Sequence, residues 1–226
     1  MRRWVATPVT WALSAWGLPT VPGDPVSPAT ARAYETFTRE RVDGSAAVTP
    51  IEPPGEPLPY LRWLAANRPV LFHGSGRAGL TELRTDRETG DSTDFGSQQA
   101  VFASDDPLWT MYFALLRRPP ELTSTRNGSW SAVGATKRFY FFSVNAGVPE
   151  EAVLGPGWLY VLPRQQFVVQ PPAFGVLHSA QWVSPQPVRP LACVAVEPAD
   201  FPFAGRIGRH RPDESMWRTA WDARRR

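Results

Sequence analysis

Two short apolar runs in this chain end in residues that could do chemistry. Val70–Ser75 has the sequence VLFHGS, and Val101–Pro107 has the sequence VFASDDP. A buried strand that delivers side chains to a cleft has this pattern of apolar residues followed by small or polar ones. His73 offers a ring nitrogen as donor or acceptor, and Gly74 offers a backbone amide that a ligand can approach closely. This His-Gly pair is therefore the first candidate site.

Composition indicates one hydrophobic core of ordinary size. The chain has 226 residues, of which 42% are hydrophobic and 20% are charged, so global disorder is not expected. The 25 prolines predict many loops rather than long helices. The net charge is +3 and Lys137 is the only lysine, which is typical of a GC-rich bacterial genome rather than of a function. Arg224–Arg226 could contact nucleic acid, but a solvated chain end is the simpler interpretation.

Cysteine and histidine usage argues against a metal site. Cys193 is the only cysteine, which excludes an internal disulfide and any cysteine-rich metal site. It lies in an apolar run, so we expect it in the core. His73, His178 and His210 lie far apart in the sequence, without metal-ligand spacing. We expect His178 and His210 on the surface and no metal cofactor.

The sequence also predicts a location in the cytoplasm. No apolar run reaches the length needed to span a membrane. Residues 1–16 weakly resemble a signal peptide, but Pro8 interrupts the stretch and no convincing cleavage site follows. We therefore expect a cytoplasmic protein without a membrane partner.

Local patterns divide the chain into two parts. We expect an N-terminal Pro-rich extension and linker over residues 1–57, and a domain with an Arg-rich tail over 58–226. Polar loops are predicted at 84–99 and 121–136, and the first could act as a lid.

Strands outnumber helices and do not alternate with them, so the predicted fold class is α+β. Helices are predicted over 29–41 after Ser27-Pro28, over 60–67, and from Pro107 with Asp106 as its N-cap. Besides the runs at 70–75 and 101–103, strands are predicted at 138–144, 158–162, 167–170, 181–184 and 191–196.

The order of these pieces resembles the ADP-ribosyltransferase superfamily, in particular its branch with a His, Tyr, Glu triad. Three motifs carry the resemblance: Leu71–Ser75; Val101–Ala103 with the helix that contains Tyr112; and Ser179–Ser184 with Val188 and the strand after it. Each motif is weak alone, and the specificity comes from their order and spacing. The resemblance implies a split β-sandwich with a few peripheral helices.

The resemblance also implies that NAD is the substrate. His73 would hydrogen-bond the adenosine ribose, the backbone of Gly74 would hold the nicotinamide carboxamide, and Tyr112 would stack on the nicotinamide ring. The implied cofactor-binding set is His73, Gly74, Ser75, Phe102, Ala103 and Tyr112. The acceptor could be a protein, a nucleic acid, a small molecule or water, and the oligomeric state stays open.

Gln181 departs from the family pattern, because transferases of this branch usually have Glu there. A carboxylate orients the nicotinamide ribose and favours the positive charge that develops as the glycosidic bond breaks. Gln keeps an acceptor but loses that charge.

The sequence therefore leaves two main hypotheses. One is an NAD-dependent ADP-ribosyltransferase or NAD glycohydrolase with Gln181 and His73 as catalytic residues. The other is a catalytically weak or inactive transferase-like module that binds NAD, ADP-ribose or a protein partner. A sister family that transfers an RNA 2′-phosphate to NAD is a further alternative, but its resemblance calls for a second His where this helix has Tyr112.

Each candidate residue also has a purely structural alternative. His73 could be hydrogen-bonded within the core, Tyr112 could pack on the apolar helix face, and Gln181 could be a solvated strand residue. The enzyme hypothesis makes a geometric prediction that separates these alternatives. A split pair of sheets should bring His73, Tyr112 and Gln181 together in one cleft, within about 10 Å of each other.

Overall fold

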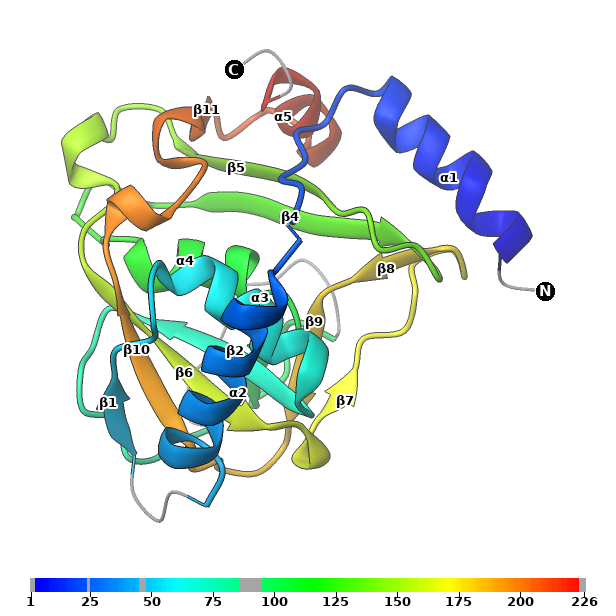
Figure 1. Ribbon diagram of the computed structural model, residues 1–226. Coiled ribbons are helices and arrows are strands. Elements are labelled where there is room, and N and C mark those ends of the chain that lie inside the picture. Colours follow the sequence, from blue (N-terminus) through cyan, green and yellow to red (C-terminus); the bar gives the residue numbers. More distant parts are fainter. Residues whose placement is uncertain (1–2, 24, 45–47, 86–94, 224–226) are drawn as a thin grey trace.

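The computed structural model describes residues 3–23, 25–44, 48–85 and 95–223, and it contains two β-sheets (Figure 1). The strands are β1 (Thr49–Ile51), β2 (Val70–Ser75), β3 (Val101–Ser104), β4 (Thr125–Ala132), β5 (Phe139–Asn145), β6 (Gly157–Pro163), β7 (Val168–Val169), β8 (Leu177–Ser179), β9 (Gln181–Ser184), β10 (Ala192–Val196) and β11 (Gly208–His210). Within these residues, the large sheet has the order β1-β10-β6-β2-β3-β9-β7 and the small sheet the order β11-β5-β4-β8. The helices are α1 (Arg3–Ala15), α2 (Pro28–Arg41), α3 (Pro57–Asn67), α4 (Pro107–Leu115) and α5 (Met216–Ala223), with short 3-10 turns at 150–152, 164–166, 198–200 and 204–206.

Helix α4 fills the space between the two sheets (Figure 1). Its sequence, PLWTMYFAL, is apolar almost all round, which is typical of a helix that is buried on every side. Leu108 and Met111 lie in one core cluster with Phe72 of the large sheet and Phe142 of the small sheet. Helix α3 packs against α4, and α2 packs against α3. The layer between the sheets is therefore a packed core along α4.

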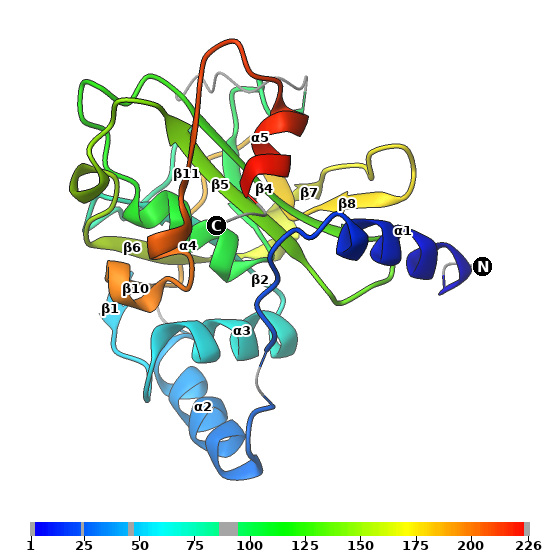
Figure 2. The ribbon, with the colours of Figure 1, turned by 90° about the horizontal axis from the view of Figure 1, so that it is seen from above.

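The outer face of the small sheet is covered by helices from near the two ends of the chain (Figures 1 and 2). Helix α1 packs on β4, and α5 packs on β5 and β11. Leu13, Leu18 and Ala220 are buried there against Phe139 and Phe141. The sequence did not predict α1, which contains Pro8, and it did not predict α5 or β11. These elements have weak local signals, and they are stabilised by packing against this sheet.

Two glycines let α4 approach the large sheet at backbone distance. A Cβ on Gly74 of β2 would overlap with Thr110 O and with Ala114 N of the helix. A Cβ on Gly157 of β6 would overlap with Ala114 O. Since these neighbours are backbone atoms, they cannot rotate away as a flexible side chain would. The position of α4 therefore requires the absence of a side chain at both strand positions.

Most of the elements predicted from local signals are confirmed. Helix α2 begins after Ser27, whose hydroxyl accepts a hydrogen bond from Thr30 N, and α4 begins after Asp106, whose carboxylate accepts one from Leu108 N. The fold class is confirmed as mixed α and β with two sheets. Strand pairing is antiparallel except between β1 and β10 and between β5 and β11.

One predicted loop and one predicted linker contain strands that the sequence did not indicate. The loop expected over 121–136 contains β4. Its inward-facing Asn127 is bonded to α4, because the Trp109 indole N–H donates to Asn127 Oδ1 at 2.7 Å. The linker expected within residues 1–57 contains β1, which pairs with β10, and Tyr34, Val42 and Ile51 are buried in the main core. Of the lid expected over 84–99, residues 86–94 lie outside the described part of the chain.

His210 is buried rather than exposed, which corrects the expectation that it lies on the surface. Only 1% of it is exposed, and its ring nitrogens lie 2.9 Å from the hydroxyls of Ser124 and Ser143. A neutral ring can donate to one serine and accept from the other. Burial, reinforced by the positive charge of Arg126, lowers the pKa of His210. His178 is partly buried, and burial lowers its pKa as well.

Replacing Gly74 or Gly157 with Ala should lower the free energy of unfolding by about 2 kcal/mol or more, because each Cβ would push α4 away from the sheet. Urea denaturation measures this. Gly205→Ala is the matched control, since a Cβ at Gly205 meets nothing within 4 Å. A loss for Gly74→Ala no larger than for Gly205→Ala would contradict the close approach.

The buried imidazole of His210 should make the fold sensitive to acid. Because its pKa is lower in the folded state, the unfolded state binds the proton more tightly, and stability falls as the pH drops below the unfolded value of about 6.5. Thermal unfolding between about pH 7.5 and pH 5 should show a smaller pH dependence in His210→Gln than in the native chain. His178→Gln reports the separate contribution of the other buried ring. If the unfolding temperature of His210→Gln depended on pH as strongly as that of the native chain, His210 would not contribute to the acid sensitivity.

Candidate functional site

The three sequence motifs form neighbouring strands in the large sheet. In the register, Phe72 of β2 lies opposite Ser104 of β3, and Ser104 lies opposite Gln181 of β9. Residues that are far apart in the sequence are thus adjacent at one end of this sheet. Which face each side chain occupies then decides whether the motifs can form one site.

His73 lies where β2 and β3 diverge, after the single registered pair Phe72–Ser104. Its Nδ1–H donates to the carbonyl oxygen of Phe102 at 2.7 Å, which fixes the ring against the neighbouring strand. In the neutral ring this bond makes Nδ1 the donor and Nε2 the acceptor nitrogen. The side chain is partly exposed.

His73 and Gly74 point to opposite faces of the large sheet. Successive strand residues alternate between faces, and Gly74 faces α4. His73 therefore lies on the outer face, together with Leu71 and with Tyr160, the register partner of His73. The chain after Ser75 covers this face, because the Tyr160 hydroxyl donates to Arg77 O at 2.7 Å. Ser75 is partly exposed, and its hydroxyl accepts from Arg77 N at 3.1 Å.

Phe102 and Ala103 of β3 also lie on opposite faces of the large sheet. Ala103 is buried on the outer face with Trp182, whereas Phe102 is partly exposed on the inner face beside Val183. The backbone carbonyl of Phe102, rather than its ring, makes the contact with His73.

Tyr112 lies in the core between the sheets and is 0% exposed. Its ring packs against Phe142 of the small sheet with a centroid distance of 4.8 Å, and also against Phe113 and Phe201. Its hydroxyl is buried without a hydrogen-bond partner among the described residues, and burial raises its pKa. Tyr112 is therefore closed off from His73 by the large sheet.

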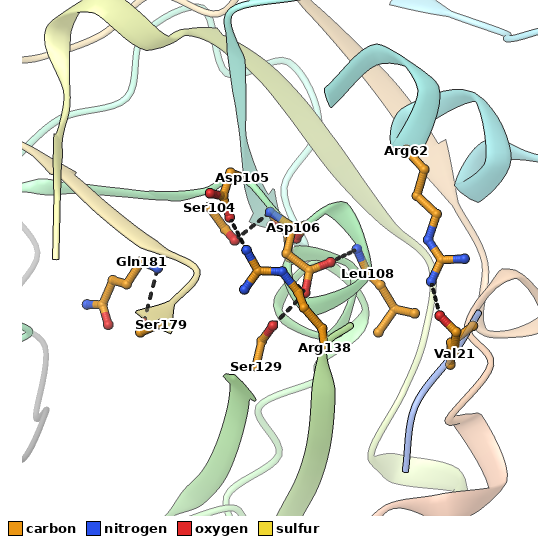
Figure 3. Close-up of polar contacts among 11 residues, drawn as sticks. Val21, Arg62, Ser104, Asp105, Asp106, Leu108, Ser129, Arg138, Ser179 and Gln181 are labelled. Carbon is orange, nitrogen blue, oxygen red and sulfur yellow. Dashed lines mark hydrogen bonds and ion pairs between the residues drawn. The ribbon is translucent and has the colours of Figure 1, made fainter. Parts of the chain in front are cut away.

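Gln181 lies on the inner face of the large sheet, because it shares the face of its register partner Ser104. It is partly exposed, and its backbone N–H donates to Ser179 Oγ at 3.1 Å. Figure 3 shows its side chain extending away from the guanidinium of Arg138. The expected convergence of His73, Tyr112 and Gln181 on one cleft is not what the structure has.

The nicotinamide end of NAD does not fit the residues that the resemblance assigns to it. A nicotinamide ring would need space beside Gly74 and a free face of Tyr112. Gly74 is instead in backbone contact with α4, and the ring of Tyr112 is enclosed by aromatic side chains. His73, in contrast, is partly exposed at a strand end and carries an acceptor nitrogen.

A polar cluster that the sequence analysis missed joins the two sheets (Figure 3). Asp106 is only 5% exposed, and its Oδ2 accepts a hydrogen bond from the Ser129 hydroxyl of β4 at 2.6 Å. Arg138 Nη2 lies 2.9 Å from Asp105 Oδ1, and its Nε lies 4.0 Å from Asp106 Oδ2. The only sequence signal was the N-cap pattern at Asp106, which predicts the helix start but not the second carboxylate contact.

The innermost atoms of this cluster are covered by protein. Arg138 Nη1 and His178 Nδ1 are buried without a hydrogen-bond partner among the described residues. Because these atoms are covered by protein, a ligand could reach them only after a rearrangement.

Among the described residues, no three His, Cys, Asp or Glu side chains are grouped so that they could hold a metal ion. None of the helices in the described ranges is long and apolar enough to cross a membrane.

Asp106→Ala should lower the free energy of unfolding by about 1–3 kcal/mol, because it removes the helix cap and the bond to Ser129 together. Asp105→Ala is the matched control: its carboxylate is more exposed than that of Asp106 and makes one partly buried ion pair but no helix cap, so a smaller loss is expected. Urea denaturation compares the two. Equal losses would show that the buried bonds of Asp106 do not stabilise the junction.

No family model matches this chain, and no curated protein or solved structure matches it either. The function is therefore argued from the geometry of the chain's own residues.

Proposed function

We propose that this chain is an ADP-ribosyltransferase-like binding module that holds the adenosine-ribose end of NAD, or ADP-ribose, without cleaving the nicotinamide-ribose bond. One observation carries the proposal: the ring of His73 is fixed by Phe102 O at the point where β2 and β3 diverge, at the end of three adjacent motif strands.

The chemistry of His73 suits a ribose hydroxyl. With Nδ1–H bonded to Phe102 O, Nε2 of the neutral ring is an acceptor nitrogen, which matches the donor character of a ribose O–H. Because the ring is already oriented by this bond, binding would need little reordering of the side chain. Ser75 lies two residues further along the same partly exposed strand end, on the same face by alternation.

Three observations argue against turnover. Tyr112 is enclosed in the core, so it offers no face on which a nicotinamide ring could stack. Gln181 carries no charge to favour the developing positive charge of the transition state. Gln181 and His73 also lie on opposite faces of the large sheet, so they would not act on one ribose together.

Calorimetric titration with ADP-ribose should show binding, and His73→Ala should weaken it about fivefold, the effect of losing one hydrogen bond. Gln165→Ala, at an exposed position in the 164–166 turn, should bind as the native chain does. With NAD, release of nicotinamide should not exceed that of a buffer blank, either for the native chain or for Gln181→Glu.

The two halves of the proposal fail in different ways. No binding of ADP-ribose, or binding unaffected by His73→Ala, would remove the nucleotide role. Nicotinamide release by the native chain would instead establish the enzyme hypothesis. Release by Gln181→Glu alone would show that the missing carboxylate is what prevents turnover.

A further inference from the structure

The turn that follows β2 is anchored over the outer face of the large sheet, next to His73. Tyr160 is the register partner of His73. Its hydroxyl donates to Arg77 O at 2.7 Å and accepts from Leu80 N at 3.2 Å. At the strand end, Ser75 Oγ accepts from Arg77 N at 3.1 Å. The backbone of this turn is therefore fixed to the same part of the sheet as the candidate ribose contact.

The side chain of Arg77 leaves this turn without a partner among the described residues. It is exposed, and its guanidinium makes no ion pair or hydrogen bond with the described part of the chain. Glu82 is the acidic residue that follows in the sequence, but its carboxylate oxygens lie 3.9 Å from the Nε atoms of Arg84 and Arg189. The turn therefore presents a positive charge that Glu82 does not neutralise.

The rest of the turn offers hydrogen-bond donors and little bulk. Ser75 Oγ already accepts from Arg77 N, and its O–H is left to donate. Ala78 and Gly79 are exposed, and their backbone N–H groups have no acceptor among the described residues. The φ of Gly79 is 71°, which favours glycine, and a Cβ there would meet no described atom within 4 Å. Open space therefore lies beside donors that the described residues leave unused.

This set of groups suits an anion with several oxygens. The guanidinium, the hydroxyl and the backbone N–H groups are all donors. Arginine binds phosphate through two parallel hydrogen bonds, and free backbone N–H groups in turns are common phosphate contacts. In ADP-ribose and NAD a diphosphate is attached to the adenosine ribose. A ribose held at His73 would thus bring a diphosphate to the same face of the sheet.

We propose that the turn of residues 75–79 binds the diphosphate of ADP-ribose, with Arg77 as its charged contact. The proposal rests on the proposed function, and it adds a basis for discrimination among ligands. A nucleoside such as adenosine could use only the ribose contact, whereas a nucleoside diphosphate would use the turn as well. The module is therefore selective for phosphorylated ligands.

The test is calorimetric titration at constant ionic strength with ADP-ribose, adenosine and inorganic pyrophosphate. The native chain should bind ADP-ribose about tenfold more tightly than adenosine, and it should bind pyrophosphate at a single site. Arg77→Gln should weaken ADP-ribose and pyrophosphate about tenfold, because a charge-assisted hydrogen bond is lost, and leave adenosine unchanged. Arg77→Lys keeps the charge but not the planar fork, so its loss should be intermediate.

Arg32→Gln is the matched control, because it removes the same charge from an exposed position on α2, which packs against α3. It should bind all three ligands as the native chain does, and circular dichroism should show every variant folded. Absence of pyrophosphate binding, indifference to Arg77→Gln, or an equal loss in Arg32→Gln would overturn the proposal.

The ribose contact and the diphosphate contact fail in different ways. Pyrophosphate has no ribose, so His73→Ala should bind it as the native chain does. If ADP-ribose binding required Arg77 but ignored His73→Ala, the diphosphate site would stand and the ribose contact would be wrong. If it required His73 but ignored Arg77→Gln, the diphosphate site would be wrong. No binding of ADP-ribose at all would overturn both.

Discussion

The close approach of α4 to the large sheet is the constraint on which the rest of the structure depends. Gly74 and Gly157 bring the helix backbone into direct contact with β2 and β6. From that position the opposite side of α4 meets the small sheet, where Tyr112 packs on Phe142. The start of the same helix places Asp106 where it can bond Ser129 across the gap. The close approaches at these two glycines thus set the position of α4 between both sheets.

This constraint changes the meaning of the His-Gly motif. A glycine beside a strand-end histidine is a reasonable signal for ligand contact, because backbone can approach a ligand there. In this chain the close neighbour of Gly74 is the helix itself. Two polar side chains of this layer are also used by the protein itself: Asp106 accepts a hydrogen bond from Ser129. The part of the inter-sheet layer along α4 is therefore a packed core that stabilises the fold.

The sequence predicted the elements with strong local signals and missed those that depend on tertiary partners. The capped starts of α2 and α4 and the apolar strands β2, β5, β6 and β10 follow from residue type and order. Strand β4 was missed because Asn127 and Ser129 face inward and find their partners on α4 and at its cap. The arrangement of the candidate site was harder to predict than the elements. Whether His73 and Gln181 share a face of the sheet depends on strand register, and a shift of one residue moves a side chain to the other face.

The filled core also determines where binding can take place. His73 and the turn after β2 lie on the outer face of the large sheet, whereas α1 and α5 cover the outer face of the small sheet. Between them stand two sheets and the helix that Gly74 and Gly157 hold in place. A ligand on the outer face of one sheet would therefore not obstruct the outer face of the other. The two sheets are connected through α4, which contacts strands of both, and through the bonds of Asp105 and Asp106 to Arg138 and Ser129.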